Sequence, residues 1–375
     1  MKARRTQPLA AVFSLTEFPS EKAHVGALTG MANALAKAGH SVQLYAFFRP
    51  RAEQMLREKF ELATAVRVGW SSRHLGRAGK ALSVAAWAII VATRRHDTIL
   101  TRSAFIALAS RRSKRVILEL HQEVPIGRIK NLALRSVFRF LRSSHYQFVF
   151  ISDSLLQHFR ATVRNLDPSK CVVSPSGYRR EWFPEHWSPS PGDRIVTYAG
   201  SLYSGRGIDL VLSIAGRVPS AEFRIVGGTP SEWLLLTTER DVAANCVHIP
   251  HVAPKSVAQF LIQSDVLIAP YQQSVYIASG ADIGRVISPL KLAEYLAAGR
   301  AIVASSLPAI RTVVTDAQTA ILVPCDDVDA WSDAIQRLLD DRRFRDSLGE
   351  RGFHYARENL NWDRRLARIM SRVSR

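Results

Sequence analysis

The sequence has few cysteines, few acidic residues relative to basic ones, and no long apolar run. Its 375 residues include only Cys171, Cys246 and Cys325, whose odd number and scattered positions exclude a disulfide framework and a cysteine-based metal site. No run approaches the roughly 18 apolar residues that a membrane span needs. The basic N-terminus lacks the apolar core and the small-residue cleavage site of a secretory signal. We therefore expect a cytoplasmic protein that does not cross a membrane.

The most apolar stretch, residues 81–93, is short and ends at Arg94 and Arg95, which predicts a buried helix. Fifty-one Lys and Arg against 32 Asp and Glu give a net charge of +19, which favours phosphate-rich partners. Nucleic acid is not expected, because the basic residues are dispersed and neither an aromatic RNA-binding signature nor zinc-finger spacing is present.

Residues 128–142 combine five basic residues with apolar ones at helical spacing, including Phe138 and Leu141. One interpretation is a basic amphipathic helix that rests reversibly on an anionic membrane, on its inner face. The alternative is an ordinary domain helix whose apolar face packs on its own sheet. The sequence leaves both open.

Short apolar runs rich in β-formers alternate with helix-length segments along the whole chain, which predicts parallel sheets covered on both faces. The predicted strands of the first half are 9–13, 41–47, 98–101, 116–120 and 148–151. Those of the second half are 195–198, 223–226, 247–249, 266–269, 301–304 and 320–323. The Pro-rich segment 184–192 reads as a linker. We expect an α/β protein of two doubly wound, Rossmann-like domains, over residues 1–185 and 193–355, facing each other across a cleft.

A glycine-rich segment follows the predicted strand 195–198. Gly200, Gly205 and Gly207 allow a tight turn and a close approach of the backbone to a ligand, and Arg206 could hold a diphosphate together with free helix-terminal amides. The spacing is neither a Walker A loop nor GxGxxG. A simple strand-to-helix turn with an exposed arginine is the alternative.

The segment 287–300, with the sequence ISPLKLAEYLAAGR, predicts a second anion site. Ser288 is a good N-cap and Pro289 a good first helical residue, so the amides of Leu290 and Lys291 are left free at a helix start. Lys291 adds a full positive charge there.

Glu294 is the exception in this helix, which is apolar almost all round. A buried carboxylate needs a partner, either hydroxyl groups of a ligand or an intrahelical ion pair with Lys291. Asp326, Asp327 and Asp329 resemble an acidic metal motif but precede a predicted helix, so we interpret them as helix caps. No metal site is predicted.

The segments GSLYSGRGIDL, FRIVGG, SDVLIAPY and SPLKLAEYLAAGRAIVASSLPAIRTVV together resemble the C-terminal domain of family 4 retaining glycosyltransferases, glycosyl transferases group 1. ILELHQEVP, FVFISDSL and VVSPSGYRREWF follow the family's order in the first half. The resemblance implies the GT-B fold and a metal-independent enzyme without a cofactor. It also implies that residues 356–375 form a helix that packs back toward the N-terminal domain.

The resemblance assigns roles to the residues named above. Gly200, Ser201 and Arg206 would hold the donor diphosphate, with Lys291 and the amides at Ser288, Pro289 and Leu290 completing the grip. Glu294 matches the second glutamate of the family's E-x7-E motif, which binds the donor ribose. Val286 stands where many members carry the first glutamate.

Two histidines of the first half are further candidates. His121, at the carboxyl end of the predicted strand 116–120, matches the family's active-site histidine, while as an isolated residue it reads as structural. His24 lies on the acceptor side, after the first strand.

The function implied is transfer of a sugar from a nucleotide-diphosphate sugar to a hydroxyl of a glycan, lipid-linked or small-molecule acceptor, with retention of configuration. The alternatives are a nucleotide-sugar epimerase and a non-catalytic nucleotide-sugar-binding member.

Overall fold

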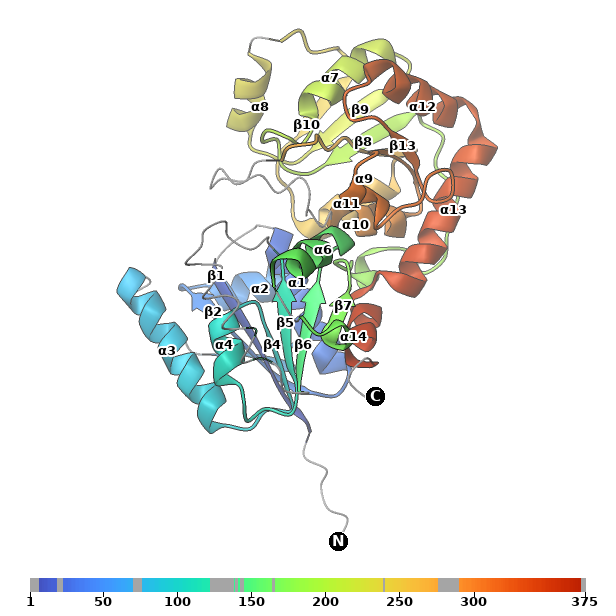
Figure 1. Ribbon diagram of the computed structural model, residues 1–375. Helices are drawn as coiled ribbons and strands as arrows, with labels where there is room; N and C mark the ends of the chain where they lie inside the picture. Colours follow the sequence, from blue (N-terminus) through green and yellow to red (C-terminus); the bar gives the residue numbers. More distant parts are fainter. Residues whose placement is uncertain are drawn as a thin grey trace. The chain divides into compact units, whose positions relative to one another are not determined.

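A computed structural model describes residues 7–18, 23–69, 76–121, 138, 141, 145–163, 166–238, 240–275 and 290–371. The chain divides into two compact units. One comprises Met1–Pro175 together with Trp362–Arg375, and the other comprises Ser176–Asn361. Each unit is built on one parallel sheet, as the sequence predicts (Figure 1).

The sheet of the first unit has seven strands in the order β3-β2-β1-β4-β5-β6-β7. Their bounds are β1 Leu9–Phe18, β2 Ser41–Phe48, β3 Val66–Val68, β4 Thr98–Thr101, β5 Val116–Leu120, β6 Tyr146–Phe150 and β7 Cys171–Val173. The helices of this unit are α1 Ala23–Lys37, α2 Ala52–Phe60, α3 Arg77–Thr93, α4 Ala104–Ala109, α6 Asp153–Thr162 and α14 Trp362–Ser371, with a 3-10 turn at Pro168–Lys170. Five strands confirm the sequence prediction, whereas β3 and β7, at the two edges, are new.

The second unit carries a six-stranded sheet in the order β10-β9-β8-β11-β12-β13. Its strands are β8 Ile195–Ala199, β9 Glu222–Val226, β10 Cys246–Ile249, β11 Val266–Ala269, β12 Ala301–Ser305 and β13 Ile321–Val323. Its helices are α7 Ile208–Arg217, α8 Pro230–Thr237, α9 Pro254–Ile262, α10 Leu290–Ala298, α11 Pro308–Arg311, α12 Val328–Asp340 and α13 Arg342–Asn359, with a 3-10 turn at Arg180–Trp182. All six predicted strands of this half are present.

Both faces of the second sheet are buried. Leu267 and Ala269 pack in a core with α10, whereas Val266 and Ile268 pack in a second core with α7 and α12. This is the period-2 alternation of a strand with a helix layer on each side, and it explains why β11 is apolar throughout.

Strand order reverses between β8 and β11, because β8 pairs with β9 on one side and with β11 on the other. In the first unit the reversal lies between β1 and β4. Ligands of open α/β sheets bind at the carboxyl ends of the strands that flank such a reversal. Functional residues are therefore expected directly after β8 and β11.

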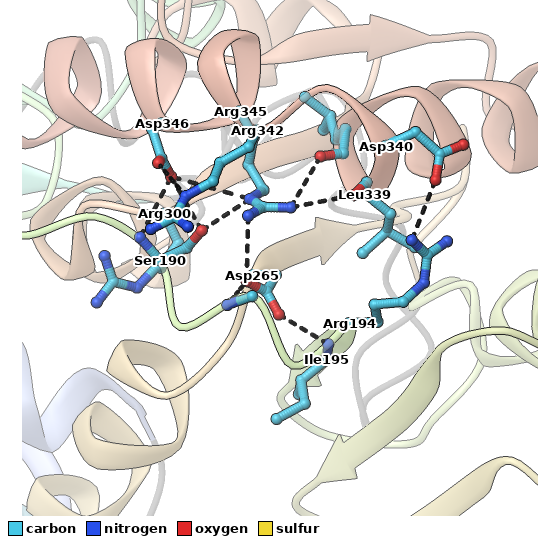
Figure 2. A network of polar contacts seen from close by, with 12 residues as sticks. Ser190, Arg194, Ile195, Asp265, Arg300, Leu339, Asp340, Arg342, Arg345 and Asp346 are labelled. Atoms are coloured by element: carbon cyan, nitrogen blue, oxygen red, sulfur yellow. Dashed lines mark hydrogen bonds and ion pairs between the residues drawn. The ribbon is translucent and has the colours of Figure 1, made fainter.

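Residues 184–192, predicted as a linker, lie inside the second unit, which begins at Ser176. A buried polar network holds this segment (Figure 2). Asp265 accepts hydrogen bonds from the backbone amides of Gly192, at 2.7 Å, and Ile195, at 3.0 Å. Arg345 donates to Ser190 at 2.7 Å and pairs with Asp265 at 3.7 Å. These contacts with residues distant in the sequence cannot be predicted from a Pro-rich segment without hydrophobic periodicity.

The apolar stretch 81–93 forms most of α3, but the expectation of a buried helix is only half right. Trp87 and Val91 are fully buried, whereas Leu82 and Ile89 are 61% and 64% exposed. Ala81, Ala85 and Ala92 continue the same outward face. In the described part of the chain, no helix combines the length and the apolarity needed to cross a bilayer.

Most of residues 128–142 lie outside the described residues, but Phe138 and Leu141 are described and both are buried. The Phe138 ring packs on Phe148 and Phe159, with centroids 4.9 and 5.9 Å away. These two residues therefore belong to the domain core, as the alternative interpretation of this segment expects, and not to a membrane-facing surface.

Candidate functional site

The loop between β8 and α7 brings its glycines against the segment that follows β11. Gly205 and Gly207 have φ of +85° and +77°. A Cβ on Gly207 would lie 1.8 Å from the carbonyl oxygen of Pro270, and one on Gly205 would lie 2.4 Å from that of Ser274. Only glycine fits both the backbone conformation and the space. The loop is thus fixed at the sheet reversal, where a ligand site is expected.

Lys291, in the first turn of α10, reaches this loop. Its ammonium Nζ lies 4.0 Å from the ring centroid of Tyr198 and 5.0 Å from that of Tyr271. A Cβ on Gly200 would lie 2.6 Å from Nζ, so the amine rests on the glycine backbone. Nζ is buried and has no hydrogen-bond partner within the described ranges. The face of an aromatic ring stabilises a buried cation by about 0.5–2 kcal/mol.

Arg206 supplies a second cation that contacts the Tyr271 ring. Its guanidinium carbon lies 5.3 Å from the Tyr271 centroid and 4.7 Å from that of Tyr203, whose hydroxyl accepts a hydrogen bond from Nη2. Two positive groups therefore share one aromatic ring. The sequence identifies both cations but not Tyr271, the ring that both of them contact.

These two charges disfavour each other. Burial, and then the charge of Arg206, hold the pKa of Lys291 well below its ordinary value, and Glu294 offsets only part of this effect. An anion bound between the two cations would remove the penalty and restore the charge on Lys291. The two groups could therefore bind a phosphate or diphosphate.

Tyr295 fixes α10 relative to the loop. Its hydroxyl oxygen accepts a hydrogen bond from the Ala199 amide at 2.8 Å, directly before Gly200. Tyr295 lies one helical turn after Lys291. Its hydrogen bond to Ala199 therefore fixes the position of Lys291 relative to the backbone of Gly200. Ser201 is exposed, and its carbonyl accepts from the Tyr198 hydroxyl at 2.7 Å.

Glu294 lies on the same helix but makes no ion pair with Lys291 or with any other residue that the structure describes. Burial raises the pKa of Glu294 to about 7, while Lys291 and Arg179 act in the opposite direction. The intrahelical ion pair that the sequence left open is therefore not formed. The carboxyl group remains available to accept hydrogen bonds from ligand hydroxyl groups.

His121 belongs to the first unit, directly after β5. Its Nε2 lies 3.2 Å from Oε2 of Glu119, two residues earlier and on the same side of the strand. Burial, and then the charge of Arg102, lower the pKa of His121 to about 4. Sequence reasoning singled out His121 but missed Glu119, although the i, i+2 spacing places the two side chains together.

The remaining predicted residues are less informative. Ser288, Pro289 and Val286 lie outside the described residues. Leu290 begins α10 and His24 lies in α1, and the side chains of both are outside the description.

The acidic stretch before α12 caps that helix. The Asp327 side chain accepts a hydrogen bond from the Ala330 amide at 2.9 Å, which confirms the capping interpretation for this residue.

Comparison with known proteins identifies a family and a fold that the chain resembles. Residues 193–341 match the family model described as glycosyl transferases group 1. A GDP-mannose-dependent alpha-(1-6)-phosphatidylinositol monomannoside mannosyltransferase of Mycolicibacterium smegmatis is 27% identical over 190 residues, which are 49% of this chain and 48% of that protein. The chain spans less than half the length of the curated relatives it matches.

Two solved structures resemble the whole chain. The sucrose-phosphate synthase of Thermosynechococcus elongatus gives a TM-score of 0.71 at 16% identity and covers 97% of each chain. Anabaena HepE in complex with UDP-glucose gives 0.69 at 13% identity, covering 98% of this chain and 99% of the other. At these identities the likeness concerns the fold, and it confirms the predicted GT-B class.

We predict that pyrophosphate raises the melting temperature of the protein and that Lys291→Met abolishes this stabilisation. Anion binding should restore the charge on Lys291, so calorimetry in buffers of different ionisation enthalpy should show proton uptake. Affinity should weaken as the pH rises through the lowered pKa. Lys255→Met, an exposed lysine of α9, is the control and should behave as the parent. Equal stabilisation of the Lys291 variant by pyrophosphate would place the anion elsewhere.

Proposed function

We propose that this protein, whose residues 193–341 belong to the glycosyl transferases group 1 family, transfers a sugar from a nucleotide-diphosphate sugar to an acceptor hydroxyl. The observation that carries the proposal is the buried ammonium of Lys291, which lies on the Gly200 backbone without a hydrogen-bond partner in the described part of the chain. A donor diphosphate would meet both this amine and Arg206.

The residues of this site suit departure of a nucleoside diphosphate. As the bond from the sugar to the diphosphate breaks, negative charge grows on the leaving oxygen, and Lys291 and Arg206 lie where they can stabilise it. Both groups are fixed before the reaction, by Tyr198 and Tyr271 for Lys291 and by Tyr203 for Arg206. No metal ion or cofactor is required, since these cations meet the charge. Retention of anomeric configuration follows from the family resemblance.

Glu294 suits the sugar part of the nucleotide. Its carboxyl group is free of intraprotein ion pairs among the described residues and lies one helical turn after Lys291, so it can accept hydrogen bonds from ribose hydroxyl groups while Lys291 holds the phosphates. His121 would contact the transferred sugar or the acceptor. One relative named above uses GDP-mannose and one structure holds UDP-glucose, which supports a nucleotide-diphosphate sugar as donor without choosing the base.

The decisive assay incubates the protein with a panel of UDP- and GDP-sugars and an acceptor extract in buffer containing EDTA. We expect release of free nucleoside diphosphate together with a new glycoside. Glu294→Gln should raise the KM for the donor by roughly 10- to 100-fold, the loss expected for hydrogen bonds to a charged group. Glu350→Gln, on exposed α13 surface, is the control and should have no effect.

Three results would contradict the proposal in different ways. Epimerised donor without diphosphate release indicates the epimerase alternative, and donor binding without turnover indicates a non-catalytic member. Activity lost in EDTA and restored by Mg²⁺ or Mn²⁺ would show that a metal ion takes part.

We further propose a cytoplasmic location with reversible attachment to an anionic membrane, and an acceptor that is a glycan or a lipid-linked glycan. The outward face of α3 suits such a surface better than Phe138 and Leu141, which are buried. Leu82 and Ile89 stand on this face, and Phe105 of the neighbouring α4 is 56% exposed. The helix contains no acidic residue and is followed by exposed Arg94 and Arg95. An apolar strip with basic residues at its end favours an anionic bilayer surface.

We predict that the protein sediments with phosphatidylglycerol vesicles at low salt and is released at high salt. Leu82→Ser/Ile89→Ser should weaken this binding by about tenfold or more, because two apolar side chains lose their burial in the bilayer. Leu234→Ser/Leu235→Ser, an apolar pair on α8 of the other unit that is at least as exposed, is the matched control. Salt-independent binding, or an equal effect of both double variants, would contradict the assignment to α3.

A further inference from the structure

The carboxylate of Glu119 is the centre of a buried polar cluster in the first unit. Glu119 is 5% exposed, and its Oε1 accepts a hydrogen bond from Nη1 of Arg365 at 2.6 Å. Its Oε2 lies 3.4 Å from Nε of Arg102 and 3.2 Å from Nε2 of His121. Arg365 comes from α14, at the opposite end of the sequence, so the cluster forms only when the C-terminal helix has packed on the first sheet.

Arg365 is held on every side. Its Nε donates to the Pro175 carbonyl at 3.0 Å and its Nη2 to the Ser174 carbonyl at 3.4 Å, and its Nη1 also lies 3.3 Å from the sulfur of Met31. The residue is 2% exposed. All three guanidinium nitrogens of Arg365 have a partner, so this side chain is fixed in one position. Its hydrogen bond therefore holds the Glu119 carboxylate in one orientation.

Glu119 is ionised in this setting. Burial alone would raise its pKa, but the charge of Arg365, the hydrogen bond from His121 and the charge of Arg102 together hold the pKa well below its ordinary value. An ionised carboxylate can only accept hydrogen bonds. The short contact with His121 therefore requires the proton on Nε2 of the imidazole.

The charge state of the histidine agrees with this assignment. Burial and the charge of Arg102 favour the neutral ring, whose pKa is about 4, over the imidazolium. A neutral imidazole carries one N–H, and with that proton on Nε2 the lone pair stays on Nδ1. The ring thus offers a hydrogen-bond acceptor, and not a donor, on the side away from Glu119.

We propose that Glu119 and Arg365 are positioning residues that hold His121 as the neutral Nε2–H tautomer, so that Nδ1 accepts a hydrogen bond from a hydroxyl group of the sugar or the acceptor. The inference rests on the proposed function, in which His121 contacts substrate. Arg365 of the C-terminal helix α14 thus helps to orient His121 without touching substrate itself. Arg365 acts through Glu119 alone.

The tautomer can be measured without any substrate. Long-range ¹H–¹⁵N correlation spectra of the ¹⁵N-histidine-labelled protein distinguish the protonated from the bare ring nitrogen, and the His121 signals are identified by their absence in His121→Gln. We expect a protonated Nε2 and a bare Nδ1 in the parent at neutral pH. A protonated Nδ1 in the parent would overturn the proposal whether or not the protein is a glycosyltransferase.

Variants then connect the tautomer with turnover. In Glu119→Gln the side-chain amide can donate as well as accept, so both tautomers should appear and kcat should fall by roughly 10- to 100-fold with the donor KM unchanged, the loss typical of removing a partner that orients a histidine. Arg365→Gln should lower kcat in the same way, and Arg365→Lys should recover part of it. Arg364→Gln, the exposed neighbour on α14, is the control.

Each outcome separates the two hypotheses. A mixed tautomer with unchanged kcat would overturn the positioning role. A parent without transferase activity but with the Nε2–H tautomer would contradict the proposed function instead. If Arg365→Gln does not fold, the other two variants still test the positioning role. Glu119→Gln keeps the shape of the glutamate side chain, and Arg365→Lys keeps the positive charge.

Discussion

The candidate site depends on one buried group without a hydrogen-bond partner among the described residues, the side-chain amine of Lys291. The fold buries this group against the Gly200 backbone and two tyrosine rings, and no described residue offers it a hydrogen bond. Buried polar groups are almost always satisfied in folded proteins, because leaving one unpaired costs about 1–3 kcal/mol or more. In the proposed function, the partner of this group is an anion that binds from solution beside the second cation, Arg206.

The two units use buried charge in contrasting ways. In the second unit Asp265 is fully satisfied by backbone amides and Arg345, and this network fixes the segment before β8 (Figure 2). In the first unit Glu119 is equally satisfied, but one of its partners is His121, which remains partly exposed. A carboxylate paired with a buried arginine therefore fixes a chain segment in one unit and, in our proposal, orients the His121 ring in the other.

The sequence predicted the elements that have a clear hydrophobic pattern and missed the features that depend on tertiary contacts. Apolar runs revealed the strands around both sheet reversals, whereas β3 and β7, with three residues each, are too short to show a period. Lys291, Arg206 and Gly200 were identified from the sequence, and the structure brings them together. Arg365 could not be found, since it lies 246 residues from Glu119. The apolar face of α3 was taken as buried because composition does not tell which side of a helix meets its sheet.

The central claim is that a nucleoside diphosphate occupies the space between Lys291 and Arg206. A crystal structure of the protein with UDP or GDP tests this most directly. We expect the diphosphate oxygens to lie within hydrogen-bond distance of Nζ of Lys291 and of the Arg206 guanidinium, beside Gly200, with the ribose at Glu294. A diphosphate bound elsewhere, with Lys291 still packed against the tyrosine rings and unpaired, would contradict it.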